Sequence, residues 1–325
     1  MAIPQRQIPQ RQIGLDGPST GVLALGSWHT YDRMHFPEAV RMLRTAVDAG
    51  ITLFDVGVYG TPETAPHHTD VLFSAMVRAA GLRREEYLFS GKLWLEEYPR
   101  ESLRAQLENA LFRAGEDHAD MVVLGDIASP DTDLHAVVAE LAELQAAGLI
   151  RQWGVNNWSV STIRAVHDFA VADGVAGPAM AQLKYSIARR SVVDGEPFAA
   201  VFGEMGVSLQ SSDVFEGGVL LGKTGGRPEH PQTAAQDRIR RRIAESAAGV
   251  RKVADDLGVS AAQLCLAFTL THPANVTTLF GSTSVAQLHD NLGAVDLLER
   301  VGAAELRALV EDLWADRDDQ DPQGP

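Results

Sequence analysis

Short apolar runs alternate with longer runs of helical periodicity over most of the chain. The short runs are rich in β-branched and aromatic residues, which is typical of buried strands, and the longer runs are typical of amphipathic helices. Strands are predicted at residues 21–26, 51–55, 87–92, 121–125, 151–155, 179–184, 207–211 and 276–280. Helices are predicted at residues 38–49, 69–80, 101–114, 134–147, 161–171, 197–205, 238–257, 261–270, 285–292 and 303–314.

The alternation of eight strands with helices predicts a closed (β/α)8 barrel, or TIM barrel, with an N-terminal hairpin and extra C-terminal helices. The 325 residues suit one large barrel, because a barrel of this class takes about 250 residues before insertions. A doubly wound open sheet is the alternative. It is disfavoured because no G-x-G-x-x-G motif follows the first predicted strand.

Both ends of the chain and one internal stretch depart from the alternation. The five residues Ile3-Pro4-Gln5-Arg6-Gln7 are repeated at once as residues 8–12, and two copies are too few for a repeat fold. We predict a disordered extension over residues 1–12, its second copy leading into a hairpin over the barrel floor, and one barrel domain over 13–315. Residues 316–325 are acidic and contain Pro and Gly, so a frayed tail is predicted. The Gly- and Pro-rich residues 217–236 predict a functional loop.

Composition and charge narrow the class of protein. Hydrophobic residues make up 45% of the chain and charged residues 22%, as in ordinary globular proteins. The net charge of −15 argues against nucleic acid or an anionic membrane as the main partner, so a small molecule is expected, and the oligomeric state is left open. Cys265 is the single cysteine, and its apolar helical surroundings predict an inert core thiol. No apolar run approaches the roughly 20 residues of a membrane span, and no apolar signal segment opens the chain, so a cytoplasmic protein is predicted.

Ionisable side chains stand at the ends of two predicted strands. Asp55 ends the second strand and Tyr59 follows it, and Lys92 ends the third. The C-terminal ends of barrel strands are where such folds keep their chemistry. For either charged residue alone the simpler interpretation is that Asp55 caps a turn and Lys92 is a solvated loop residue. No metal site is predicted.

Further short motifs occur in order on the strands of this eightfold alternation. They are Phe54-Asp55 with Tyr59-Gly60, Gly91-Lys92, Trp153-Gly154-Val155-Asn156-Asn157-Trp158-Ser159, Gln182 with Tyr185, Gly217-Gly218-Val219-Leu220-Leu221-Gly222-Lys223, and Gly281-Ser282-Thr283-Ser284 with Gln287 and Asn291. With these motifs the chain resembles the aldo-keto reductases, and most closely the branch that includes the potassium-channel β-subunits. The resemblance spans about residues 14–310. It implies a barrel-shaped reductase that uses NADPH, with NADH not excluded.

The resemblance implies a division of roles between three residues. Tyr59 would give a proton to the heteroatom of a reduced substrate, although a phenol has a pKa near 10. Lys92 would lower that pKa by stabilising the phenolate, and Asp55 would pair with Lys92. The alternative is that Asp55 and Lys92 form only a salt bridge at the barrel mouth.

Cofactor positions are assigned by the same resemblance. The amides of Asn157 and Gln182 would fix the nicotinamide, or else cap their own turns. The turn at Gly281 precedes a helix whose N–H groups suit a phosphate, and Gln287 with Asn291 would reach the adenine. Lys223 would approach the pyrophosphate, or else be a solvated loop lysine, and Arg227 or Arg238 is the candidate cation for a 2′-phosphate. The cofactor set is Asn156, Asn157, Gln182, Ser212, Gly218, Lys223, Arg227, Arg238, Gly281, Thr283, Gln287 and Asn291.

The sequence departs from the family pattern in three places. Tyr59 follows Asp55 by four positions, where the family usually has five. The fourth strand has no histidine at its end, and either Gly125 or Asp126 occupies that position, depending on the direction of counting. Ser212 replaces the aromatic residue that usually stacks on the nicotinamide. A carboxylate would stabilise a protonated imine. Asp126 as a catalytic residue therefore suggests imine reduction beside carbonyl reduction. In the simpler interpretation Asp126 only starts the loop.

Tryptophans follow three of the strands. Trp28, Trp94 and Trp158 either line a substrate pocket at the barrel mouth or serve as ordinary packing. Two functions therefore stand side by side. One is a reductase of C=O or C=N bonds, and the other is a nucleotide-binding, redox-sensing module with little or no turnover.

Overall fold

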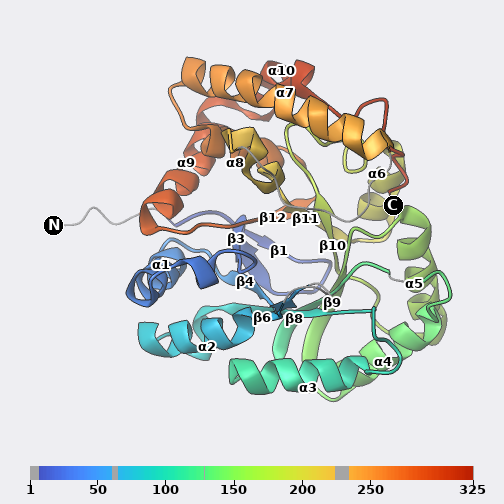
Figure 1. Cartoon of the computed structure of the whole chain (residues 1–325). Coiled ribbons are helices and arrows are strands. Elements are labelled where there is room, and N and C mark those ends of the chain that lie inside the picture. The colour runs from blue at the N-terminus through green and yellow to red at the C-terminus, as the bar shows by residue number, and fades with distance from the viewer. Residues whose placement is uncertain (1–6, 61–64, 128, 224–233, 325) are drawn as a thin grey trace.

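The computed structural model describes residues 7–60, 65–127, 129–223 and 234–324. Within this part of the chain, eight parallel strands close into a barrel in the order β10-β11-β12-β3-β4-β7-β8-β9 (Figure 1). The strands are β3 Leu23–Gly26, β4 Leu53–Val56, β7 Leu88–Leu93, β8 Ala119–Leu124, β9 Ile150–Asn156, β10 Met180–Lys184, β11 Ser208–Ser212 and β12 Asn275–Phe280. The (β/α)8 prediction is confirmed, and the open-sheet alternative is wrong because β12 pairs with β3 and closes the sheet.

Helices surround the barrel, as Figure 1 shows. They are α1 Phe36–Asp48, α2 Thr69–Ala80, α3 Leu103–Ala114, α4 Leu134–Ala146, α5 Val160–Asp173, α6 Glu196–Glu204, α7 Ala234–Leu257, α8 Ala261–Leu270, α9 Val285–Val301 and α10 Ala303–Leu309. Two short antiparallel pairs stand apart from the barrel sheet: β1 Gln10–Gln12 with β2 Ser19–Gly21, and β5 Val58–Tyr59 with β6 His67–His68. Short 3-10 helices complete the described elements: η1 Tyr31–Arg33, η2 Arg84–Glu86, η3 Glu216–Leu221 and η4 Glu311–Leu313.

The strands present different side chains to their two faces. A small apolar cluster that includes Leu53, Met121 and Val123 fills the barrel interior away from the C-terminal ends of the strands. Phe54 and Val56 alternate with Leu53 and belong to the larger core between the strands and the helices. Because successive side chains of a strand point to opposite faces, Asp55 shares the inward face of β4 with Leu53. The inward-facing positions thus change from apolar to polar toward the C-terminal ends of the strands.

The N-terminal segment is ordered from residue 7 onward, which corrects the prediction of a disordered extension for that part. Ile8 is buried and its backbone N–H donates to the carbonyl of Ala49 at 2.9 Å. The side-chain amide of Gln10 donates to the carbonyl of Gly50 at 2.8 Å, and β1 pairs with β2. The second copy of the duplicated sequence therefore packs against the turn that joins α1 to β4. Residues 1–6 of the predicted extension lie outside the described residues.

The C-terminal segment is also ordered, so the predicted fraying of residues 316–324 is wrong. The carboxylate of Asp316 is fully buried and accepts the backbone N–H groups of Arg190, at 3.0 Å, and Ser191. The indole of Trp314 donates to the same carboxylate at 2.7 Å. Further along, the N–H of Val160 donates to the carbonyl of Gln323 at 2.9 Å. These contacts fasten the tail to the loop after β10 and to the start of α5.

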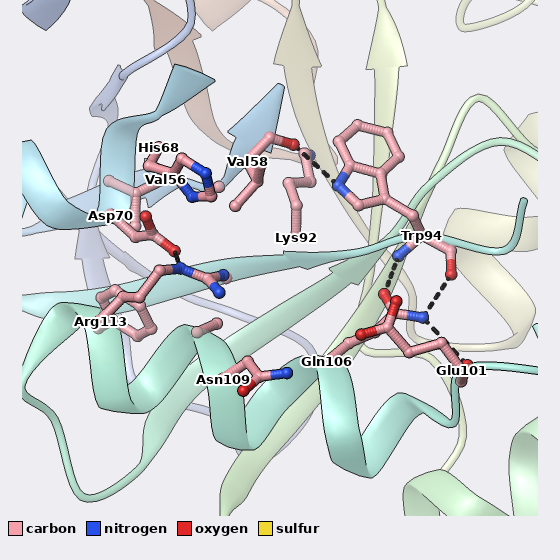
Figure 2. Close-up of a pocket in the computed structure, with 14 residues that line it drawn as sticks. Val56, Val58, His68, Asp70, Lys92, Trp94, Glu101, Gln106, Asn109 and Arg113 are labelled. Atoms are coloured by element: carbon pink, nitrogen blue, oxygen red, sulfur yellow. Dashed lines mark hydrogen bonds and ion pairs between the residues drawn. The ribbon is translucent and has the colours of Figure 1, made fainter. Parts of the chain in front are cut away.

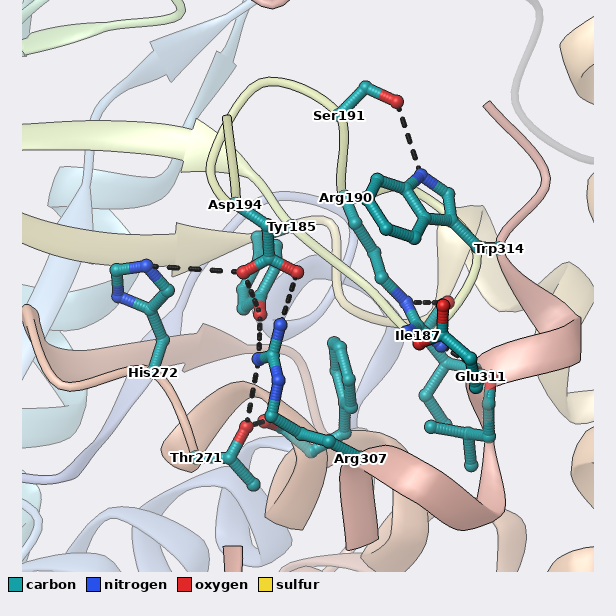
Figure 3. A network of polar contacts seen from close by, with 12 residues as sticks. Tyr185, Ile187, Arg190, Ser191, Asp194, Thr271, His272, Arg307, Glu311 and Trp314 are labelled. Carbon is teal, nitrogen blue, oxygen red and sulfur yellow. Dashed lines mark hydrogen bonds and ion pairs between the residues drawn. The ribbon is translucent and has the colours of Figure 1, made fainter. Parts of the chain in front are cut away.

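The buried side chain of Arg190 also contacts the C-terminal segment. Its side chain is 1% exposed, donates through Nε to the carbonyl of Ile187 at 2.7 Å and pairs with Glu311 at 3.2 Å (Figure 3). The guanidinium lies over the rings of Phe268, at 4.6 Å, and Trp314, at 5.6 Å, an arrangement that favours a cation. A buried charge is tolerated here because it is paired and hydrogen-bonded.

No single helix in the described part of the chain is both long and apolar enough to cross a bilayer. The segments Ala235–Leu257 and Ala261–Leu270 meet the length and composition only as a pair, and the chain bends by 92° between them.

We expect Asp316→Ala to lower the free energy of unfolding by about 3 kcal/mol, because removing the carboxylate leaves several buried donors without an acceptor. Urea denaturation measures the change. Asp318→Ala is the matched control, since Asp318 is exposed two positions away, and it should change stability by less than about 0.5 kcal/mol. Equal stability of the two variants would contradict the anchoring role of Asp316.

Candidate active site

Polar side chains from four strands meet inside the C-terminal mouth of the barrel. Asp55 of β4, Lys92 of β7, Gln182 of β10 and Gln210 of β11 are all at least nine-tenths buried. The Lys92 ammonium lies 3.2 Å from one carboxylate oxygen of Asp55, Oδ2, and donates to the amide oxygen of Gln182. The Gln182 amide nitrogen donates to the same Asp55 oxygen at 3.0 Å and to the amide oxygen of Gln210 at 2.6 Å. Asp55 and Lys92 are thus a buried ion pair rather than a turn cap and a solvated lysine.

Tyr59 joins this cluster through the other carboxylate oxygen. Its hydroxyl donates to Asp55 Oδ1 at 3.0 Å, although the spacing is one residue shorter than the family pattern. The short pair of β5 with β6 holds Tyr59, and the backbone at Gly57 makes the turn between β4 and β5. A Cβ atom at Gly57 would lie 2.9 Å from the Cβ of Lys92, so only glycine fits between phenol and lysine. Asp55 therefore stands between Tyr59 and Lys92 and contacts both.

The environment raises the pKa of the Tyr59 phenol well above its ordinary value near 10. Burial is the main cause, because it disfavours the phenolate, and the negative charge of Asp55 adds to it. A hydrogen bond with the side chain of Ser27 acts in the opposite direction but is outweighed. Lys92, which was expected to lower this pKa, is not among the groups that contribute most to it. The ammonium is directed to Asp55 and Gln182, and the carboxylate is the nearer charge for the phenol.

Gly125 and Asp126 follow β8, and either could occupy the position where the family usually has a histidine. The direction in which the strand residues point distinguishes the two. Met121 and Val123 point into the barrel, so Gly125 continues the inward series and Asp126 falls out of phase. Asp126 is exposed, and its carboxylate accepts the side-chain amide of Asn156 at 2.7 Å. The assignment of Asp126 as a catalytic residue is corrected accordingly: it lies at the rim with Asn156 and not in the buried cluster.

Trp94 fills the space that a side chain at Gly125 would need. A Cβ atom at Gly125 would lie 2.5 Å from Cε3 of the Trp94 indole. The indole N–H donates to the carbonyl of Val58 at 3.0 Å. The side-chain amide of Gln106 accepts from the backbone N–H of Trp94 at 2.8 Å and donates to its carbonyl at 2.9 Å. Trp94 is therefore a fixed wall beside the cluster.

Two of the three candidate tryptophans flank Tyr59. Trp28 stacks on the Tyr59 ring with centroids 5.7 Å apart and is 42% exposed, and Trp94 meets the same ring edge-on at 5.9 Å. Trp158 is 2% exposed, and its indole donates to the carbonyl of Gly125 at 2.8 Å. Trp28 and Trp94 can line a substrate pocket at the mouth, whereas Trp158 packs beneath the surface, and its assignment to the pocket is corrected.

The two predicted nicotinamide amides have different surroundings. Asn157 adopts a left-handed backbone conformation with φ of 53°, and its side-chain oxygen accepts the N–H of Lys184 at 3.2 Å. Its side chain therefore ties the end of β9 to β10. Gln182 belongs to the Asp55 cluster. Ser212, the last residue of β11, lies half-buried at the same end of the barrel.

The turn before α9 is held by its own side chains. Ser284 caps the helix and accepts the N–H of Gln287 at 3.2 Å. The side-chain oxygen of Gln287 accepts the N–H of Thr283 at 2.9 Å, and the buried amide of Asn291 donates to the hydroxyl of Ser282 at 3.1 Å. The amides predicted to reach an adenine thus organise the turn. A Cβ atom at Gly281 would lie 2.7 Å from the Thr30 methyl group, so the turn and the loop after β3 lie in close contact.

The side chains proposed to bind the cofactor phosphates have different surroundings. The stem of Lys223 folds over Gly218, which has φ of +94°, and a Cβ atom there would lie 2.6 Å from the lysine Cδ. Arg238 binds Asp319 through two nitrogens at 2.9 and 2.6 Å, and this hydrogen bonding lowers the pKa of Asp319. Arg238 is therefore held by the C-terminal segment. Arg227 lies outside the described residues, as does much of the predicted loop at 217–236.

Three residues that support the cluster were not predicted from the sequence. Gln210 is fully buried beneath Gln182, and Ser27 and Gln106 contact Tyr59 and Trp94 respectively. A glutamine inside an apolar strand was the available signal for Gln210. No signal was available for Gln106, because its contact with Trp94 depends on how α3 lies against β7.

The fold and this cluster define the protein as a (β/α)8 barrel whose site lies at the C-terminal ends of its strands. The chain belongs to the aldo/keto reductase family, whose family model matches residues 22–309. The family expectation drawn from the sequence is thereby confirmed.

Curated relatives agree with the expected branch. The "Putative voltage-gated potassium channel subunit beta" of Schizosaccharomyces pombe is 24% identical over 340 aligned positions, covering 95% of this chain and 94% of that protein. The "Probable voltage-gated potassium channel subunit beta" of Oryza sativa subsp. japonica is 26% identical, and that of Arabidopsis thaliana 25%, each over 308 positions covering 89% of this chain and 91% of the relative. The likeness to proteins named as channel β-subunits extends over nearly the full length.

We expect Lys92→Met to lower the free energy of unfolding by about 3–5 kcal/mol, because the Asp55 carboxylate would stay buried without its cation. Adding Asp55→Asn to that variant should restore part of the loss. Urea denaturation measures both changes. Lys252→Met is the control, because Lys252 pairs with Asp256 at 2.8 Å in an exposed position, and such pairs contribute little to stability. A loss at Lys92 no larger than at Lys252 would contradict a buried ion pair.

Proposed function

We propose that the protein is an NADPH-dependent oxidoreductase that transfers a hydride to a C=O or C=N bond of a small molecule. The observation that supports this most is the buried chain from Tyr59 through Asp55 to Lys92 at the barrel mouth. A phenol, a carboxylate and an ammonium lie together there, in a chain that belongs to the aldo/keto reductase family, and such a group suits proton donation.

The residues at the mouth suit a dinucleotide by the chemistry of their donors. The first turn of α9 carries backbone N–H groups after Gly281, and a helix start favours a phosphate. Asn157 follows β9, Gln182 lies within β10 and Ser212 ends β11. These three residues would face the nicotinamide end. Lys223 beside Gly218 is the cation for the pyrophosphate. Asn156, Thr283, Gln287 and Asn291 complete the proposed set.

The choice of NADPH over NADH rests on the family. Arg238 is engaged with Asp319, so Arg227 is the remaining candidate cation for a 2′-phosphate among the two proposed. When bound, the cofactor would supply the hydride. The protein side chains would supply orientation and the proton.

Tyr59 would act as a neutral hydrogen-bond donor and proton donor. Its raised pKa keeps the phenol protonated over the whole physiological range, so it would yield its proton only to a strongly basic acceptor such as a newly formed alkoxide. Lys92 would keep the Asp55 carboxylate ionised, and that carboxylate orients the phenol. Trp28 and Trp94 would hold a flat substrate against Tyr59.

Both C=O and C=N substrates remain within the proposal. A preference for imines would need a carboxylate facing the substrate, and Asp126 lies instead at the rim with Asn156. Gly125 with the Trp94 indole offers an apolar wall instead. Tyr59 is then the donor that a carbonyl oxygen or an imine nitrogen would meet.

A second function is a nucleotide-binding module that senses redox state and turns over little or not at all. The similarity to proteins named as potassium channel subunits favours it, as does the raised pKa of Tyr59, which makes the phenol a reluctant acid. In either function we propose a small-molecule ligand and a cytoplasmic location, since the net charge is −15 and the single cysteine allows no internal disulfide.

We expect Tyr59→Phe to lower kcat for NADPH oxidation by a factor of about 100 to 10,000, the usual contribution of a positioned acid, while the affinity for NADPH changes less than about threefold. Stopped-flow fluorescence with panels of carbonyl and imine substrates measures turnover, and fluorescence titration measures NADPH binding. Asp126→Ala is the matched control at the same rim and should leave both quantities within about threefold.

Three results would discriminate the proposals. Tight NADPH binding without turnover on either panel would contradict the reductase and support the sensing module. No binding of NADPH would contradict both. Turnover unchanged in Tyr59→Phe would contradict the proposed role of the phenol.

A further inference from the structure

A cavity of about 240 Å³ lies on the outer side of the barrel wall, between β7, the start of α2 and α3 (Figure 2). Phe89 and Gly91 of β7 form its inner wall, and Gln106, Asn109 and Arg113 of α3 face it. A Cβ atom at Gly91 would meet nothing nearer than 3.7 Å, so the glycine widens a space that a side chain would otherwise enter. The cavity is therefore polar on its helical side, where a helix on a sheet is usually apolar.

Arg113 is paired with a carboxylate in this cavity through only one of its three guanidinium nitrogens. Its Nε donates to Oδ2 of Asp70 at 2.8 Å, and the other oxygen of Asp70 accepts the N–H of Val71 at 2.9 Å. Asp70 is 1% exposed, so the pair is set into the wall. The hydrogen bond and ion pair of Arg113 with the described residues are made by Nε, and none is formed there by the terminal nitrogens Nη1 and Nη2. Figure 2 shows these nitrogens pointing away from Asp70, on the side of the cavity where Asn109 lies.

We propose that this cavity binds a small oxyanion, either the carboxylate of a small organic acid or inorganic phosphate. The two terminal nitrogens of Arg113 form the planar fork that such groups accept in a bidentate manner, and the amide of Asn109 supplies a further donor. The volume corresponds to about eight water molecules at roughly 30 Å³ each, so the ligand has few non-hydrogen atoms. The fixed partner Asp70 holds the guanidinium in place and lowers the entropy lost when the ligand binds.

The oxyanion site is separate from the cluster around Tyr59, and the inference does not rest on the proposed function. Lys92 and Trp94 contribute to the cavity wall, but the ammonium of Lys92 is directed into the barrel toward Asp55. Gln106 faces the cavity and holds the backbone of Trp94 through two hydrogen bonds. The ligand would therefore lie behind the Trp94 wall.

The test is isothermal titration calorimetry of the full chain with sodium phosphate and, separately, sodium acetate, at constant ionic strength and up to about 20 mM ligand. We expect one saturable equivalent with at least one of the two anions. Asn109→Leu should weaken that affinity at least about tenfold. The double variant Asp70→Asn with Arg113→Gln should abolish it, and it leaves no buried charge unpaired.

Arg104→Gln is the control, because Arg104 lies on the same helix but pairs with Glu108 at an exposed position, and it should leave the affinity unchanged. Binding of acetate alone would identify a carboxylate ligand, and binding of phosphate alone a phosphate. Circular dichroism checks the fold, and if the double variant does not fold, Asn109→Leu decides. Absence of saturable binding to both anions, or equal losses in the Asn109 and Arg104 variants, would overturn the proposal.

Discussion

One buried carboxylate, that of Asp55, organises the mouth of this barrel. A carboxylate removed from water costs several kcal/mol unless a cation and hydrogen-bond donors replace the lost hydration. Lys92 supplies the cation at 3.2 Å, Gln182 donates to the same oxygen, and the Tyr59 hydroxyl donates to the other. These three side chains are held in place by their contacts with the Asp55 carboxylate. The same contacts bring together the groups proposed to act in proton transfer.

The constraint extends from the carboxylate into the surrounding backbone. Gly57 is required because a side chain there would strike Lys92, and this close turn brings Tyr59 back over Asp55 despite the short spacing. Gln210 supports Gln182 from beneath, and Trp94 closes the side where the fourth barrel strand ends in Gly125. The result is a neutral phenol with a raised pKa, held by a charge of the sign that opposes its ionisation.

Much of the fold could be predicted from the sequence because the two periodicities alternate cleanly. The helix α2 was predicted with both of its ends, since Gly81 follows it in a left-handed conformation that ends the helix. The helix α9 continues to Val301, nine residues beyond its predicted end, and the predicted helix over 303–314 divides into α10 and a 3-10 turn. The order in the two terminal segments depends on contacts between distant residues, such as Ile8 with Ala49 and Asp316 with Arg190, which local pattern does not reveal.

The site shows the same limit. That Asp55, Tyr59 and Lys92 meet follows from their positions on strand ends, but which atom bonds to which does not. The last four residues of β8, Met121 to Leu124, are apolar on both faces, so alternation in the sequence could not decide whether Gly125 or Asp126 points inward. The burial of Trp158 could not be predicted either, because whether an indole is covered depends on residues distant in the sequence, such as Gly125, whose carbonyl accepts its N–H.

The ionisation of Tyr59 tests the central claim most directly. Carbon-13 labelling of the tyrosine ζ-carbons, with the Tyr59→Phe variant to assign the resonance, follows that single phenol by NMR as the pH rises. The Asp55-centred arrangement predicts that the Tyr59 resonance keeps its protonated position where an ordinary phenol, with a pKa of about 10, is already half ionised, because both burial and the carboxylate raise the pKa. Ionisation of Tyr59 below about pH 9 would show that Lys92 and not Asp55 controls the phenol, and would contradict the account.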